Sequence, residues 1–374
     1  MKQHHSRFGQ CIIVAVALMA ILALPACSGE SPPAMTPSPA GAETSPWPVE
    51  AAGVWTLGMN GTVTHLSERA VRAQSVTVVP AAAWDRLGTY LAISPERRAA
   101  FVARPRPAES DIFMVDLNDG DSKAICSVTG VIRSIQLSRD AAVLYLWYNA
   151  YADARFAECD IDAGTVEAQS DILVRQSPGD WFILHGEVDS SETVTLISYH
   201  GANTQGADVL FKQEGGWRHC GWKPLDGLEA CILAHGQARF LPGSSTALVL
   251  ASGSSTLYFF DLIGGTFDEL ESMIADNHLM RFELADGFAT VVGSCGYKPG
   301  LARIDLRTTA VEYLSSAICG ELAESWNGRV VVAANRRPVP TAGVDGKLQL
   351  LDATTGLVTD LVVPSEIVSL AVAR

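Results

Sequence analysis

Short apolar runs recur along the chain at a nearly constant spacing, and this repetition limits the possible folds more than any other feature. The six runs cover residues 99–103, 142–147, 193–199, 247–251, 289–292 and 330–334. Their first residues are 43, 51, 54, 42 and 41 positions apart. A period of about 40 to 50 residues is typical of repeated supersecondary units, so we expect a repeat architecture.

A second mark follows most of these runs: an apolar strand that ends in an aspartate and a tight turn. The aspartates are Asp116, Asp160, Asp261, Asp305 and Asp352. Their spacings are 44, 101, 44 and 47 residues, so one repeat lacks the mark. Aspartate commonly accepts backbone N–H bonds in turns, so we expect these residues to form hairpins and not to bind a ligand or metal.

A ring of four-stranded sheets explains both marks. The second strand of each sheet is covered on both faces by neighbouring sheets, so it reads as a continuous apolar run. The third strand lies nearer the rim and alternates, as residues 257–262 do. The sequence therefore predicts an all-β fold, a single β-propeller over residues 49–374.

Both ends of this domain read as parts of one further sheet. Residues 368–372 resemble an innermost strand, and residues 54–57 and 62–66 resemble outer strands. Together they predict a seventh blade that closes the ring and removes exposed sheet edges. Residues 69–88 have no place in this scheme, so eight blades are the alternative.

Two segments resemble known propeller families. Residues 93–102 and 111–116 resemble the TolB-type, WD40-like repeat, with Glu96-Arg97 where Asp-Gly is usual. Residues 351–356 are similar instead to the repeat of YVTN-type and PQQ-type propellers. These families share a fold and have no single function, so the resemblance implies architecture alone.

The N-terminal segment has the pattern of a bacterial lipoprotein signal. Lys2 and Arg7 precede an apolar run over residues 11–24, which is too short to span a bilayer as a helix. The run ends in Leu-Pro-Ala-Cys at residues 24–27, which resembles a lipobox. The resemblance implies that residues 1–26 are removed and that the Cys27 sulfur carries a diacylglyceryl group. The new N-terminal amine is usually acylated as well, for example with palmitate. A plain secretory signal is the alternative.

Several acyl chains on Cys27 would anchor the protein stably to a membrane. Ser28 after the lipobox is compatible with the outer membrane, if the organism has one, and otherwise with the outer face of the cytoplasmic membrane. Residues 27–48 are dominated by Pro, Ser, Ala, Gly and Thr and read as a tether. We therefore expect a lipid-anchored protein of the cell envelope.

The charge of the chain restricts its partners. The net charge is −14, and it becomes −16 when residues 1–26 are removed, because that segment contains Lys2 and Arg7 and no acid. A body this acidic repels nucleic acid. We expect no nucleic-acid partner, membrane contact through the lipid anchor, and an envelope protein or glycan as the ligand.

Six cysteines remain after Cys11 is lost with the signal and Cys27 is lipidated. An even number in an oxidising compartment indicates disulfides. The topology of a propeller favours three pairs: Cys295–Cys319, Cys220–Cys231 and Cys126–Cys159. Buried free thiols or a metal site are the alternatives, although no C-x-x-C spacing supports zinc.

No catalytic motif emerges from the sequence. The chain contains no G-x-S-x-G elbow, Walker loop, H-E-x-x-H or C-x-x-C-H motif. The segment 293–296 resembles a nucleophile turn, but we expect it to be a structural hairpin. The histidines fall in different repeats without ligand spacing. We therefore predict no catalytic residue, metal or cofactor.

Basic and aromatic residues gather in the loops expected between second and third strands, which lie on one face of a propeller. They are Arg104, Arg106, Arg155, Lys298, Arg336, Arg337, Tyr148, Tyr151 and Tyr297. Guanidinium groups and aromatic rings suit an anionic or sugar-like ligand, so these residues form a candidate rim. The alternative is that they are ordinary surface residues, with acids such as Asp226 and Glu324 cancelling their charge.

These observations favour a non-catalytic binding or adaptor propeller of the envelope. One alternative is an enzyme acting on a polysaccharide, a lyase or glycosidase, which would need paired carboxylates near the channel mouth. Another alternative is a redox or quinone-dependent protein. A colourless purified protein would count against that alternative.

The lipobox generates a direct prediction. Replacing the acceptor thiol in Cys27→Ser should abolish lipid labelling and release the protein from the membrane fraction, because no other anchor remains. Mass spectrometry of the mature N-terminus measures this. An unmodified Cys27 in the wild-type protein would contradict the prediction.

Overall fold

In the computed structural model, the described residues are 53–66, 73–77, 84, 88–150, 153–170, 182–189, 191–200, 205–213, 216–219, 237–241, 246–250, 256–261, 266–271, 279–285, 287–293, 300–316, 318, 320, 322–326, 329–333, 345–352 and 355–373. All of them belong to one compact unit, Ser45–Arg374. They form strands and turns, and none lies in a helix long and apolar enough to cross a membrane. The predicted signal, Cys27 and the tether lie outside the described residues.

The strands of the described residues form seven four-stranded antiparallel sheets. Blade 1 contains β4 (Leu91–Ser94), β5 (Ala99–Arg104), β6 (Ser110–Asp116) and β7 (Ser122–Val128); blade 2 contains β8 (Val131–Leu137), β9 (Val143–Ala150), β10 (Asp153–Asp160) and β11 (Thr165–Ser170). Blade 3 contains β12 (Phe182–Val188), β13 (Val194–His200), β14 (Gln205–Gln213) and β15 (Gly216–His219); blade 4 contains β16 (Gln237–Phe240), β17 (Thr246–Leu250), β18 (Thr256–Asp261) and β19 (Thr266–Glu271). Blade 5 contains β20 (Leu279–Ala285), β21 (Phe288–Gly293), β22 (Leu301–Asp305) and β23 (Val311–Ser315); blade 6 contains β24 (Leu322–Trp326), β25 (Arg329–Ala333), β26 (Gly346–Asp352) and β27 (Val358–Val363). The closing blade contains β28 (Ile367–Ala373), β1 (Gly53–Gly58), β2 (Thr62–Leu66) and β3 (Ala73–Thr77).

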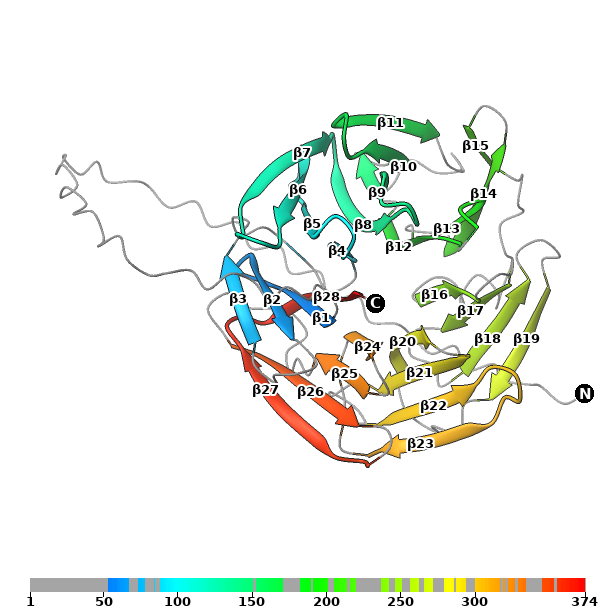
Figure 1. Cartoon of the computed structure of the whole chain (residues 1–374). Helices are drawn as coiled ribbons and strands as arrows, with labels where there is room; N and C mark the ends of the chain where they lie inside the picture. The colour runs from blue at the N-terminus through cyan, green and yellow to red at the C-terminus, as the bar shows by residue number, and fades with distance from the viewer. Residues whose placement is uncertain are drawn as a thin grey trace, which may run out of the picture. The chain divides into compact units, whose positions relative to one another are not determined.

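The inner strands of neighbouring blades contact one another in a closed ring. The contacts join β28 to β4, then β8, β12, β16, β20 and β24, and finally return to β28. Figure 1 shows the sheets following one another around these inner strands. The ring confirms the predicted all-β propeller fold, and the seven sheets of the described residues equal the predicted number of blades.

Within the described residues, the six apolar runs coincide with the second strands, as the repeat pattern predicts. In blade 1, residues 99–103 of β5 are all buried, and in blade 2 the same holds for residues 144–150 of β9. A second strand contacts a neighbouring blade on each face, so burial does not alternate along it. The third strand β6 does alternate between buried and half-buried residues, because it lies farther from the axis.

The closing blade is built from both ends of the domain. Strand β28 pairs with β1 in antiparallel register, with Val54 opposite Val372 and Thr56 opposite Leu370. The outermost strand, β3, lies within residues 69–88, which the sequence pattern left unassigned. This segment therefore completes the seventh blade. Its strand was missed because five residues of modest hydrophobicity carry no clear periodicity.

The repeated aspartates form turns, as predicted. The Oδ1 atoms accept backbone N–H bonds at 2.7 to 2.9 Å in four hairpins: Asp116 from Asn118, Asp160 from Ala163, Asp305 from Arg307 and Asp352 from Thr355. Each aspartate carbonyl also accepts a bond from the residue four positions later. The turn after Asp261 lies outside the described residues.

Aromatic side chains fill the space between blades 2 and 3. Phe156 packs edge-on against Trp217 with ring centroids 5.2 Å apart. The Trp217 Nε1 atom donates a hydrogen bond to Glu158 Oε1 at 2.7 Å. Burial is the main cause that raises the pKa of the Tyr145 hydroxyl above its ordinary value. The interface between blades 2 and 3 therefore combines buried aromatic side chains with a hydrogen bond from Trp217 to Glu158.

The backbone conformation of the aspartate hairpin turns predicts one stabilising substitution. Thr309 has a φ of 58°, whereas the equivalent positions in three other blades are Gly120, Gly164 and Gly356. A β-branched residue is strained in this left-handed conformation, so Thr309→Gly should raise the free energy of unfolding by up to about 1 kcal/mol in urea titrations.

Gly356 offers the matched reverse change, because a Cβ there would meet nothing within 4 Å. Gly356→Thr should lower stability by about 1 to 2 kcal/mol through backbone conformation alone. A loss of stability in Thr309→Gly would show that the threonine is not strained.

Candidate functional site

A disulfide joins blades 1 and 2, from Cys126 in β7 to Cys159 in β10. This pair is one of the three expected from the sequence. The sequence separation of 33 residues corresponds to about 4 kcal/mol of loop-closure entropy removed from the unfolded chain. The cysteines of the other expected pairs, Cys220, Cys231, Cys295 and Cys319, lie outside the described residues.

The buried Ser110 hydroxyl holds the β5–β6 loop against the connection from blade 1 to blade 2. Its Oγ donates to the carbonyl of Gly130 at 2.6 Å and accepts the backbone N–H groups of Ile132 and Arg106, both at 3.1 Å. The Gly130 N–H also donates to the carbonyl of Ala108 at 3.0 Å. The loop and the blade connection therefore lie on the same face, as the propeller topology predicts.

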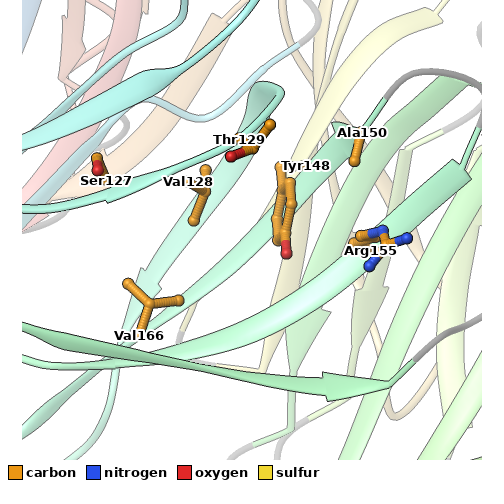
Figure 2. A pocket seen from close by; sticks show the side chains of 7 residues that line it. All are labelled: Ser127, Val128, Thr129, Tyr148, Ala150, Arg155 and Val166. Carbon is orange, nitrogen blue, oxygen red and sulfur yellow. The ribbon is translucent and has the colours of Figure 1, made fainter.

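A pocket opens on this face beside the disulfide, and we call it pocket A (Figure 2). Its volume is about 370 Å³, and its lining residues are Ser127, Val128, Thr129, Tyr148, Ala150, Arg155 and Val166. Cys126 precedes Ser127 in β7, and Cys159 is the register partner of Val166. The disulfide therefore connects the two blades that supply the walls of pocket A.

A second pocket, pocket B, meets pocket A at Thr129. Its volume is about 310 Å³, and its lining residues are Pro107, Ala108, Thr129, Gly130, Val131, Arg133 and Asn149. Val131 and Arg133 belong to β8, the inner strand of blade 2, whereas pocket A reaches the outer strands β7 and β11. Pocket B therefore lies nearer the inner strand of blade 2, and pocket A nearer its outer strand.

Each pocket is lined by one cationic side chain, Arg155 in pocket A and Arg133 in pocket B. The remaining lining residues are uncharged. Ser127 Oγ donates a hydrogen bond to Oε1 of the exposed Glu109 at 2.9 Å, so a carboxylate also lies beside pocket A. In a chain with a net charge of −14, the lining residues of this junction therefore include two arginines and several side chains with hydroxyl groups.

In blade 1, the structure corrects the expected position of Arg104 and shows the partners of both predicted rim arginines. Arg104 and Arg106 both form ion pairs with Asp111, and the Arg104 guanidinium lies 4.8 Å from the centroid of the Phe113 ring. Arg104 also ends β5 and does not lie in a loop. The two arginines therefore share one carboxylate on the next strand, and Arg106 lies in the β5–β6 loop, as predicted from the sequence.

The predicted positions of two other rim residues also need correction. Tyr148 lies in β9 and is buried, and Arg155 lies in β10 directly opposite it. The strands of blade 2 extend further than the apolar run, so both residues belong to the sheet and not to a loop. Lys298, Arg336, Arg337, Tyr151 and Tyr297 lie outside the described residues.

The sequence interpretation missed Arg133, Asn149, Ser127 and Thr129 as lining residues. The Thr-Gly turn at residues 129–130 was an available signal, because Gly130 has a φ of 132° and a Cβ there would lie 2.3 Å from the Asn149 carbonyl oxygen. Only glycine, which has no Cβ, can occupy position 130 so close to this carbonyl oxygen. The turn therefore marks the place where two blades and both pockets meet.

No group of three His, Cys, Asp or Glu side chains within the described ranges is placed to hold a metal ion. His65 is buried in β2 and stacks on Trp55 with ring centroids 4.2 Å apart. It contributes to the core of the closing blade. Gly293 ends β21, and the rest of the segment 293–296 lies outside the described residues.

No protein-family model and no curated protein sequence matches the chain. Several solved structures are similar to it. A Bacteroides fragilis protein proposed to be a 6-phosphogluconolactonase shares 10% identity over 88% of this chain and all of its own, with a TM-score of 0.62. The periplasmic gluconolactonase PpgL of Pseudomonas aeruginosa shares 13% identity over 86% of this chain and 99% of its own, with a TM-score of 0.57. TolB from Acinetobacter baumannii shares 15% identity over 85% of this chain and 82% of its own, with a TM-score of 0.50. At these identities the likeness shows a β-propeller fold.

Proposed function

We propose that this chain is a lipid-anchored binding propeller of the cell envelope that holds an anionic ligand in pocket A. The observation that carries the proposal is the combination of Arg155 with hydroxyl groups and small apolar side chains in one open pocket between two crosslinked blades. Cys27 supplies the anchor, and the tether lets the propeller reach a partner beyond the lipid surface.

The lining of pocket A suits a carboxylate on a polar ligand. A guanidinium group can donate two parallel hydrogen bonds to a carboxylate, which fixes both its position and its orientation. Ser127, Thr129 and Tyr148 carry hydroxyls that donate and accept hydrogen bonds. Val128 and Ala150 supply apolar surface for the less polar face of a ring.

The walls of pocket A are fixed before a ligand binds. The Cys126–Cys159 disulfide connects its two blades, and Ser110 holds the adjacent loop and blade connection together. A site that needs little ordering loses less conformational entropy on binding, so more of the contact energy appears as affinity. This rigidity supports a binding function.

An enzyme acting on a polysaccharide is the alternative class. A glycosidase would place two carboxyl groups on opposite sides of the scissile bond, whereas the charged side chain that lines pocket A is an arginine. The gluconolactonase and the proposed 6-phosphogluconolactonase among the similar structures suggest a lactone as another substrate to test. Hydrolysis of glucono-δ-lactone or of an acidic polysaccharide above the buffer rate would favour an enzyme.

Binding of galacturonate, a sugar with one carboxylate, tests the proposal on the soluble propeller. Saturation-transfer NMR should detect binding with a dissociation constant of about a millimolar, as expected for a small polar ligand. Arg155→Gln should weaken binding by at least about tenfold, because a hydrogen bond to a charged group is lost. Binding should also weaken as salt rises, because mobile ions screen the charges.

Two variants control this experiment. Arg155→Lys keeps the charge without the planar fork, and Arg307→Gln removes an exposed arginine in the β22–β23 hairpin. The lysine variant should retain part of the binding, and the Arg307 variant should bind like wild type. Equal binding by the wild type and Arg155→Gln, with both proteins folded, would reject pocket A as the site.

A further inference from the structure

We infer that the outer edge of blade 6, strand β27, binds an extended segment of a partner protein by strand addition. The partner segment has apolar residues at alternate positions and basic residues at its ends. This interaction surface is separate from pocket A, which lies between blades 1 and 2, so the inference does not depend on the proposed function.

Strand β27 has a regular and open edge. It is the last strand of its sheet, after β24, β25 and β26, and no other described strand pairs with its outer side. Figure 1 shows it at the outside of the ring. It pairs with β26 without a register shift, from Gly346 opposite Val363 to Leu351 opposite Val358. An edge of this kind presents a row of backbone N–H and C=O groups that a further strand can bind.

The outer strands of the other blades differ from β27 in features that oppose strand addition. The pairings of β7, β11 and β23 with their neighbours each contain a register shift. Strand β15 has four residues, β19 contains three acids, and β3 has five residues with Val76 as its one large apolar residue. Strand β27 has six residues, of which four are Val or Leu, and it contains no proline or lysine. It is therefore the outer strand with the least protection against pairing.

The side chains of β27 favour a partner with apolar residues at alternate positions. Val358 and Val362 lie on the same face of the strand as Asp360, because successive side chains alternate between faces. The exposed fraction is 37% for Val358, 70% for Val362 and 66% for Leu357, which directly precedes the strand. The remaining exposed large apolar side chain among the described residues is Tyr313, in β23 of blade 5. A strand with apolar side chains opposite the two valines would remove their surface from water.

Charge favours a different protein over a second copy of the chain. Asp360 is the one charged residue of β27, and its carboxylate pairs with the Lys347 ammonium at 2.7 Å. The whole chain has a net charge of −14, so it attracts a basic segment and repels an acidic one. A second copy brings the same negative charge. The antiparallel register that places Val358 opposite Val362 would also place Asp360 opposite its own copy, and like charges directly opposite destabilise a strand pair.

A designed peptide tests strand addition. The probe is rhodamine-labelled Lys-Thr-Val-Thr-Val-Thr-Val-Thr-Lys, and fluorescence anisotropy measures its binding to the propeller. Two isomers carry N-methyl groups either on the three valines or on three of the threonines, so each isomer lacks the N–H donors of one edge. One isomer should bind like the unmethylated peptide and the other at least about tenfold more weakly, because backbone hydrogen bonds to β27 are lost. Equal binding of the two isomers would show that strand pairing does not hold the peptide.

Two matched variants locate the peptide on the ring. Val362→Lys places a charge on the edge of β27 and should weaken binding at least about tenfold. Tyr313→Lys makes the same change of charge on β23 and should bind like wild type. Both side chains are more than half exposed, so both variants should fold, which thermal unfolding checks. Unchanged binding by Val362→Lys, or an equal loss in both variants, would reject β27 as the site.

Three further measurements test the kind of partner. A peptide with Glu in place of both Lys residues should bind more weakly at low salt, and equal binding would overturn the basic partner. Sedimentation velocity should find a monomer, whereas a wild-type dimer that Val362→Lys abolishes would make a second copy the occupant and overturn the inference. Galacturonate should leave the peptide bound, and displacement would place the peptide at pocket A instead.

Discussion

The pairing of β28 with β1 is the interaction on which the rest of the structure depends. It joins strands from opposite ends of the domain, with Val372 opposite Val54, and gives the closing blade its inner strand. That strand contacts β4 on one side and β24 on the other, so the ring closes only when the pair forms. Closure removes the exposed inner edge of β1 and packs every blade between two neighbours.

Because the ring is closed, the candidate ligand sites lie at the junctions between neighbouring blades. At the junction of blades 1 and 2, the Cys126–Cys159 disulfide and the Ser110 hydroxyl act on the face that bears both pockets. On the hairpins β4–β5 and β10–β11, Arg97 forms an ion pair with Asp162 at 2.7 Å, and this contact holds the pKa of Asp162 below its usual value. These contacts fix two blades relative to one another, so a ligand meets walls that are already positioned.

The sequence predicted the features that arise from period and burial. The second strands, the aspartate turns and the closing blade follow from apolar runs and turn residues, so one chain was enough to place them. Side-chain geometry was less accessible: Arg104 and Arg106 resembled an open basic rim, but both pair with Asp111 on the next strand, which offsets one of their two charges. Arg133 carried no signal because a β-bulge, which depends on the partner strand, determines its direction. The predicted lipid anchor remains a prediction from the motif at Cys27.

Hydrogen–deuterium exchange of the propeller, alone and saturated with galacturonate, tests most directly whether the junction of blades 1 and 2 is the ligand site. Backbone amides exchange more slowly where a ligand restricts local opening. The account predicts slower exchange confined to residues 127–133 and 148–156, with the other blades unchanged. Slower exchange in blades 3 to 6 without any change in these two segments would contradict it.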